Sequence, residues 1–177
     1  MTDAREYGKA LFMLAKEEDI ADIVKSDAEC LRQLISDNPE YTKLLDTPAI
    51  SKAERLNAIE ESLSSLHVYL LNLVKMLAEK HSVYLLSSAL DGYFSAYDEA
   101  YGIERVVAIT AVEMTEGELE RLKSNLEKQT GKTIIIKNTI DKSLLGGIKL
   151  RGMGIQLDSS LKTKLEQIEK SIRSAVV

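Results

Sequence analysis

The sequence is poor in the residues that form disulfides, zinc sites and membrane spans. It has one cysteine, Cys30, so no disulfide can form within the chain, and this fits a cytoplasmic protein. The two histidines, His67 and His81, stand alone, without the spacing to another histidine or cysteine that a zinc site needs. The longest apolar cluster, residues 68–77, is interrupted by polar residues and is shorter than the roughly 18 residues of a membrane span.

The chain also lacks the patterns of common enzyme sites and of export signals. No Gly-x-Ser-x-Gly elbow occurs, and the acidic residues within 17–22 indicate a solvated turn rather than a metal site. Residues 1–6 have neither the apolar core of a secretory signal nor the acid-poor pattern of a transit peptide. The residues alone therefore predict a two-domain soluble interaction protein, and they identify no catalytic, cofactor-binding or metal-binding residues.

The charged residues, aromatic residues and prolines are unevenly distributed between the two halves of the chain. Its 177 residues allow one domain or two small ones. Residues 1–105 carry 11 Lys and Arg against 19 Asp and Glu, a net charge of −8, whereas residues 106–177 carry 12 against 9, a net charge of +3. All nine aromatic residues and both prolines precede residue 105. We therefore predict two domains, 1–105 and 106–177, whose cores are built from different residues.

The first half has the periodicity of helices. Apolar residues recur at spacings of three and four, which predicts about six helices joined by short connections, hence a helical bundle. Asn38-Pro39 predicts an N-cap followed by proline at the first helical position, and Ser51 with Glu54 forms a capping box. Residues 66–77 are apolar on nearly every side, which is typical of a helix buried centrally or covered by a partner.

The second half alternates strands and helices. Residues 106–112 and 133–136 are rich in β-branched side chains and predict strands, and a capping box at Thr115 starts a helix between them. An apolar series over 148–157 predicts one further strand, with Lys149 and Arg151 on a shared face. A final helix is predicted from the spacing of Leu161, Leu165, Ile168 and Ile172. The predicted fold class is α+β: a helical bundle followed by a small α+β domain.

Two glycine segments suggest an alternative function. Gly131-Lys132-Thr133 is similar to the end of a phosphate-binding loop, but Leu126 stands where that loop needs glycine, and the predicted order is helix then strand. Gly146-Gly147 does not complete a dinucleotide fingerprint and predicts a tight entry into a strand. A small nucleotide-binding enzyme that uses these loops is the alternative. A nucleic-acid-binding helical regulator is disfavoured by the acidic first half.

Three groups of motifs resemble one known family. Residues 146–165 read GGIKLRGMGIQLDSSLKTKL, which resembles the C-terminal motif of the delta subunit of F-type ATP synthases, the oligomycin-sensitivity-conferring protein of mitochondria. Residues 4–12 are similar to the first helix of that family, and residues 38–39, 47–50 and 79–80 follow in the family's order. Glu6 and Gly8 stand where the family commonly has proline and alanine, which predicts a loosened first helix, and residues 153–154 also depart from its pattern.

The resemblance implies a non-enzymatic stator subunit that takes part in ATP synthesis and hydrogen ion transport. It implies that the helical domain binds N-terminal segments of the alpha subunits and that the second domain binds the C-terminal end of the b-subunit stalk. It implies no cofactor, no nucleic acid and no direct membrane insertion. With no leader pattern at Met1, the expected location is peripheral, at the cytoplasmic face of a bacterial cell membrane.

The resemblance also predicts which side chains meet these partners. An amphipathic partner helix needs an apolar groove, and the first helix and the helix over 66–77 are its predicted walls. The predicted partner-binding residues are Tyr7, Ala10, Leu11, Leu14, Tyr69, Leu70, Leu73 and Arg151. Most of them are expected to fill the bundle core, with a smaller part exposed to a partner.

Overall fold

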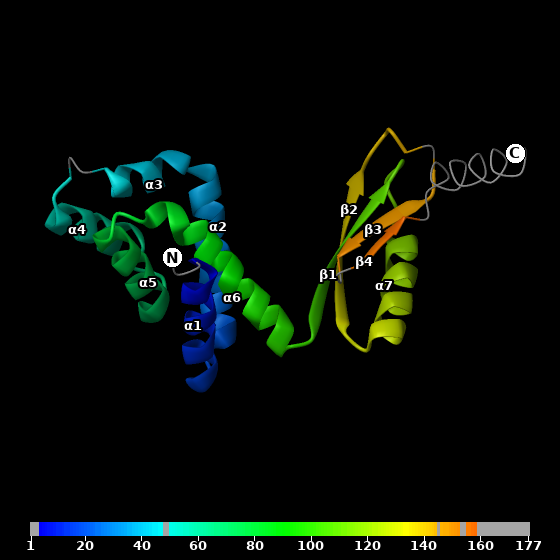
Figure 1. The fold of residues 1–177 in the computed structure, drawn as a ribbon, viewed down its shortest axis with the longest axis horizontal. Helices are drawn as coiled ribbons and strands as arrows, with labels where there is room; N and C mark the ends of the chain where they lie inside the picture. The colour runs from blue at the N-terminus through cyan, green and yellow to red at the C-terminus, as the bar shows by residue number, and fades with distance from the viewer. Residues whose placement is uncertain (1–3, 48–49, 145, 153–154, 159–177) are drawn as a thin grey trace, which may run out of the picture. The chain divides into compact units, whose positions relative to one another are not determined.

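The chain divides into two compact units, Met1–Ala100 and Tyr101–Val177, which we call the helical unit and the sheet unit. The computed structural model describes residues 4–47, 50–144, 146–152 and 155–158 (Figure 1). The predicted fold class, a helical bundle followed by a small α+β domain, is confirmed.

The helical unit is built from short helices, and the prediction of about six is confirmed within the described residues. They are α1 (Ala4–Glu17), α2 (Ala21–Asp37), α3 (Pro39–Asp46), α4 (Lys52–Ser62), α5 (Val68–Glu79) and α6 (Leu86–Ala100), with a 3-10 turn η1 (Val83–Leu85) before α6.

The helices α1 and α6 cross with their backbones in close contact (Figure 1). A Cβ on Gly8 would lie 1.8 Å from the carbonyl oxygen of Ala89, and one on Gly92 would lie 2.1 Å from that of Arg5. Each glycine therefore faces the backbone of the other helix, where no methyl group fits. Gly8 is thus what lets α1 reach α6, a role that the expected loosening of the first helix does not include.

An aromatic cluster extends the contact between α1 and α6 and connects α2 to these two helices. The ring of Phe12 meets the rings of Tyr93 and Tyr97 edge to face, with centroids 5.7 and 6.0 Å away. The buried hydroxyl of Tyr93 donates to the carbonyl oxygen of Ala21 at 2.7 Å, and that of Tyr97 donates to the carboxylate of Asp22. The first turn of α2 is thus held by polar bonds at the edge of an aromatic core.

A buried arginine connects several segments elsewhere in the helical unit. Arg55 of α4 is only 2% exposed, and its guanidinium donates to the carbonyl oxygens of Thr47 at 3.0 Å, Ile50 at 3.1 Å and Ala78 at 3.0 Å. Ala78 lies in the last turn of α5, where carbonyl groups run out of helical partners. Arg55 therefore joins α4, the end of α5 and the segment before α4.

The helix α4 begins with the predicted capping box, whereas α3 begins without a side-chain capping bond. The Ser51 hydroxyl accepts the backbone N–H of Glu54 at 3.3 Å, and the Glu54 carboxylate accepts that of Ser51 at 3.0 Å. A further bond from the Ser51 hydroxyl lowers the pKa of Glu54. Asn38 is the N-cap residue of α3 and Pro39 is at its first helical position, as predicted. The Asn38 side chain makes no capping hydrogen bond, and its amide instead donates to the carbonyl oxygen of Leu34 at 3.0 Å.

The sheet unit pairs a helix with a mixed sheet (Figure 1). Its elements are β1 (Ile103–Thr110), α7 (Glu116–Thr130), β2 (Thr133–Ile140), β3 (Ile148–Gly152) and β4 (Ile155–Asp158). The strand order is β2-β1-β3-β4, with β1 and β2 parallel and the other pairs antiparallel. Leu126 of α7 packs with Val106 and Ile134 in a small core on one face of the sheet.

The predicted strands of this unit differ from the observed ones in extent and number. The parallel ladder pairs Ile103 with Thr133 and Thr110 with Ile140, so the first two strands are aligned over their whole length. The single strand predicted over 148–157 is wrong, because β3 and β4 are antiparallel and Gly152 is paired with Ile155. Gly152 has φ 141°, and a Cβ there would lie 2.6 Å from a backbone oxygen of β1, so only glycine fits. The predicted final helix lies outside the described residues.

Substituting either crossing glycine should destabilise the helical unit. We expect Gly8→Ala and Gly92→Ala each to lower the free energy of unfolding by about 1–3 kcal/mol or more, because the new methyl group meets backbone that has no space to move into. Gly117→Ala in α7 is the matched control, since its Cβ has nothing within 4 Å. Urea unfolding followed by circular dichroism measures the difference, and equal stability of all three variants would contradict it.

The helical unit should fold on its own, because its aromatic residues and helical core are self-contained. The predicted end at residue 105 lies within β1, where residues 103–105 pair with 133–135 of β2. A fragment of residues 1–102 avoids that unpaired strand. We expect it to show a helical circular dichroism spectrum and a cooperative melt. An insoluble or non-cooperative fragment would show that the two-domain division is wrong.

Candidate functional site

The predicted partner-binding residues of α1 lie in two different environments. Leu11 is 6% exposed and belongs to the core, whereas Ala10 and Leu14 are exposed on the surface of the helix. Tyr7 is half-buried, and the Nζ of Lys80, just after α5, lies 5.5 Å from the centroid of its ring. This cation–π contact brings α1 next to the end of α5. The surface that α1 offers to a partner is therefore narrower than its apolar sequence pattern indicates.

The predicted residues of α5 mostly face inward. Leu70 is fully buried and Leu73 is 7% exposed, while Tyr69 is half-buried with its ring 5.1 Å from that of His67. The prediction that this strongly apolar helix lies in the interior thus holds for these two leucines. On α5, Val68 is an exposed large apolar side chain, at 53%. In this structure, α5 therefore exposes only a small part of the apolar surface that was predicted to contact a partner.

A hollow that the sequence did not indicate lies between α1 and α6. Its volume is about 400 Å³. The apolar lining includes Phe12 and Ala96, and Lys9, Lys16 and Glu99 add charges of both signs. Met13, 67% exposed, also lines it. Methionine is flexible and polarisable, and it is common where proteins bind helices. Met13 was missed because it falls between the stripe residues Leu11 and Leu14.

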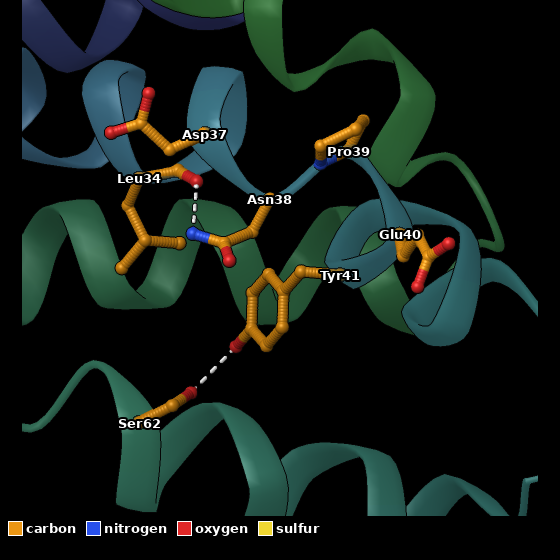
Figure 2. A pocket seen from close by; sticks show the side chains of 7 residues that line it. All are labelled: Leu34, Asp37, Asn38, Pro39, Glu40, Tyr41 and Ser62. Atoms are coloured by element: carbon orange, nitrogen blue, oxygen red, sulfur yellow. Dashed lines mark hydrogen bonds between the residues drawn. The ribbon is translucent and has the colours of Figure 1, made fainter.

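A second hollow, of about 530 Å³, lies between α2, α3 and α4 (Figure 2). The hydroxyl of Tyr41 lies 2.6 Å from the Oγ of Ser62, which itself donates to the carbonyl oxygen of Ala58 at 2.6 Å. Because Ser62 has one hydroxyl proton, Tyr41 is the donor in this pair. Asp37 and Glu40 are the charged residues that line the hollow. Its hydroxyl groups are already paired with one another, so nothing here indicates a catalytic site.

The glycine segments of the sheet unit have structural roles. Gly131 ends α7 with φ 68°, and Lys132 forms an ion pair with Glu104 at 3.0 Å, so the predicted helix C-cap is confirmed. Gly146 and Gly147 have φ of 146° and 83° directly before β3, which is the tight strand entry that was predicted. The order at Gly131 is helix, turn and strand, the reverse of a phosphate-binding loop.

A hollow of about 450 Å³ beside Gly146 is also unsuited to phosphate. It is lined by the first turn of α7, whose N-terminus is closed by the capping box of Thr115 and Glu118. The backbone N–H of Thr115 donates to Glu118 at 2.9 Å, and this bond lowers the pKa of that carboxyl group. Glu118 therefore keeps its negative charge, and Glu113 adds a second carboxylate to the lining. Both would repel an anion.

Within the described residues, no group of histidine, cysteine and carboxylate side chains is arranged to hold a metal ion. No helix in the same part of the chain combines the length and hydrophobicity that crossing a membrane requires. The last predicted partner residue, Arg151, is exposed on β3 and pairs in register with Val107 of β1.

Comparisons with known proteins agree over nearly the whole chain. The family model described as ATP synthase delta (OSCP) subunit matches residues 4–172. ATP synthase subunit delta of Leuconostoc mesenteroides is 31% identical, over 96% of this chain and 94% of its own length. The protein of that name from a Geobacillus species is 29% identical, over 96% of both chains. A chain of the Toxoplasma gondii mitochondrial ATP synthase hexamer has the same fold, with a TM-score of 0.75 at 21% identity over 97% of this chain and 98% of its own.

The geometry at Gly131 predicts that the protein neither binds nor hydrolyses ATP. Isothermal titration with Mg-ATP should give no heat of binding for the wild type, Lys132→Ala or the control Lys128→Ala. The reason is that a helix C-cap presents carbonyl oxygens, not the N–H groups that hold phosphate. Micromolar binding that is lost only in Lys132→Ala would contradict this reading.

Proposed function

We propose a mechanical role for this chain, which belongs to the ATP synthase delta (OSCP) subunit family. It is a non-catalytic subunit of the peripheral stalk of an F-type ATP synthase. The stalk holds the catalytic head still while the rotor turns, so that proton flow is converted into ATP synthesis. Such a subunit transmits force through its contacts and needs no reacting group.

The two units divide this task between two partners. The helical unit binds N-terminal segments of the alpha subunits in the catalytic head, and the sheet unit binds the C-terminal end of the b-subunit stalk. The observation that carries this proposal is the change of composition near the boundary of the units, from −8 with nine aromatic residues to +3 with none. Surfaces of such different charge fit different partners.

The surface of α1 is where the helical unit meets the head. Ala10, Met13 and Leu14 are exposed on this helix, and Met13 lines the hollow beside α6. An amphipathic helix laid there would bury apolar side chains worth roughly 1.5–3 kcal/mol each. A few such contacts are enough for an affinity in about the micromolar range after the costs of association.

The location follows from the same proposal. As a stalk subunit, the chain sits peripherally, at the cytoplasmic face of a bacterial cell membrane, and no helix among its described residues could cross that membrane. The bacterial relatives support this assignment.

Charged substitutions on the exposed side of α1 should weaken binding to the head. We expect Met13→Glu and Leu14→Glu each to reduce affinity for stalk-free head about tenfold or more, because burying a carboxylate against an apolar partner costs its hydration. Both residues are exposed, so the fold should be unaffected. Ile23→Glu is the matched control, since Ile23 is 54% exposed on α2. Equal binding by all three variants would show that α1 is not the contact.

Removing the sheet unit should separate the two contacts. We expect the fragment of residues 1–102 to bind the head nearly as tightly as the full chain and to bind the stalk not at all. Sedimentation with stalk-free head, and capture by immobilised b-subunit stalk, measure the two affinities. A folded fragment that fails to bind the head would show that the division of labour is wrong.

A further inference from the structure

The two faces of the sheet differ in chemistry. Val106 and Ala108 of β1 are buried on the face that α7 covers, so the alternate residues of β1 point to the opposite face. The strand registers extend this assignment across β2 and β3. We call this opposite side the outer face and define it by Val107, Ile109, Ile135, Lys137, Lys149 and Arg151.

The outer face is an aliphatic strip with basic residues on both sides. Val107 lies between Lys137 of β2 and Arg151 of β3, and Ile109 is paired with Lys149. Lys137 and Arg151 are exposed, as is Ile135 at 42%, while the two β1 side chains are half-buried. The sheet therefore presents apolar surface flanked by the basic residues Lys137 and Arg151, and Asp158 of β4 pairs in register with Lys149 beside it.

We propose that the outer face is a docking surface for one amphipathic helix, with an aliphatic stripe and acidic residues along both flanks. The proposal rests on the proposed function, and names the surface through which the sheet unit meets the stalk. Charge complementarity selects the partner: glutamate and aspartate flanks would pair with Lys137 and Arg151 while the stripe covers Val107 and Ile109.

The dimensions of the sheet fit a single helix. Eight residues of β1 extend over about 26 Å, and three adjacent strands span about 10 Å between the outer two. An α-helix is about 10 Å across and rises about 1.5 Å per residue, so about 17 residues cover the strip. The partner segment is therefore about five turns long.

Other occupants are a poorer match to this surface. Residues 106–177 contain no aromatic side chain, whereas membrane-interface segments rely on tryptophan and tyrosine, and single-stranded nucleic acids stack on aromatic rings. The chain's own residues 159–177 carry four basic and two acidic side chains, so their charge is of the wrong sign for a basic surface. An acidic helix from another protein remains the best fit.

Charge reversal on the outer face tests the proposal in the full-length protein. We expect Lys137→Glu and Arg151→Glu each to weaken binding to immobilised b-subunit stalk about tenfold, because each removes an attraction and adds a repulsion. The matched controls are Lys128→Glu and Arg121→Glu, which make the same charge change at exposed positions of α7. They should bind like the wild type, and added salt should reduce the difference.

The outcomes separate this proposal from the function on which it rests. If the wild type binds the head but not the stalk, the proposed function is wrong. If the wild type binds the stalk and all four variants bind equally well, the function stands and the outer face is not the contact.

Three further results would also overturn the proposal. A melting temperature several degrees lower in the outer-face variants alone would show that the chain itself covers this surface. Loss of a dimer in light scattering would assign it to a second copy. Binding to phosphatidylglycerol vesicles that only the outer-face variants lose would assign it to lipid.

Discussion

The close approach of α1 and α6 at Gly8 and Gly92 is the constraint on which the helical unit depends. Because the two backbones touch there, Phe12 of α1 reaches the rings of Tyr93 and Tyr97 in α6. Those tyrosines then use their hydroxyl groups to hold the first turn of α2. A wider spacing would separate the rings and break this chain of contacts, so two small residues determine where three helices lie.

Arg55 is a second fixed point, and of a different kind. A buried cation is unfavourable unless it is hydrogen-bonded, and here three backbone carbonyl groups accept from the two terminal nitrogens of Arg55, while its buried Nε has no hydrogen-bond partner. These carbonyl groups belong to Thr47, Ile50 and Ala78, from segments that are not otherwise joined by regular secondary structure. Because these hydrogen bonds are directional, the guanidinium fixes the orientation of the segments as well as their proximity, which a hydrophobic contact cannot do.

Features that depend on neighbours in sequence were predictable, and those that depend on packing were not. The capping boxes at Ser51 and Thr115 and the helix end at Gly131 are local, and the structure has them as predicted. The role of Gly8 depends on the backbone of a helix some eighty residues away, which no periodicity reveals. The requirement for Gly152 at the end of β3 also depends on packing, because this residue faces a backbone oxygen of β1.

The same distinction between sequence spacing and packing explains why only some of the predicted partner-binding residues are exposed. Spacing places Leu11 and Leu14 on one apolar stripe, but only packing decides that Leu11 enters the core and that Leu14 stays outside. A subunit that bears torque needs buried residues that keep its interior rigid and exposed residues that adapt to a partner. The glycine crossing and Arg55 supply the first, and flexible exposed side chains such as Met13 can supply the second. The partner contacts proposed for it are therefore apolar and basic surface side chains rather than groups with strongly shifted pKa values, and sequence motifs of catalysis do not mark such side chains.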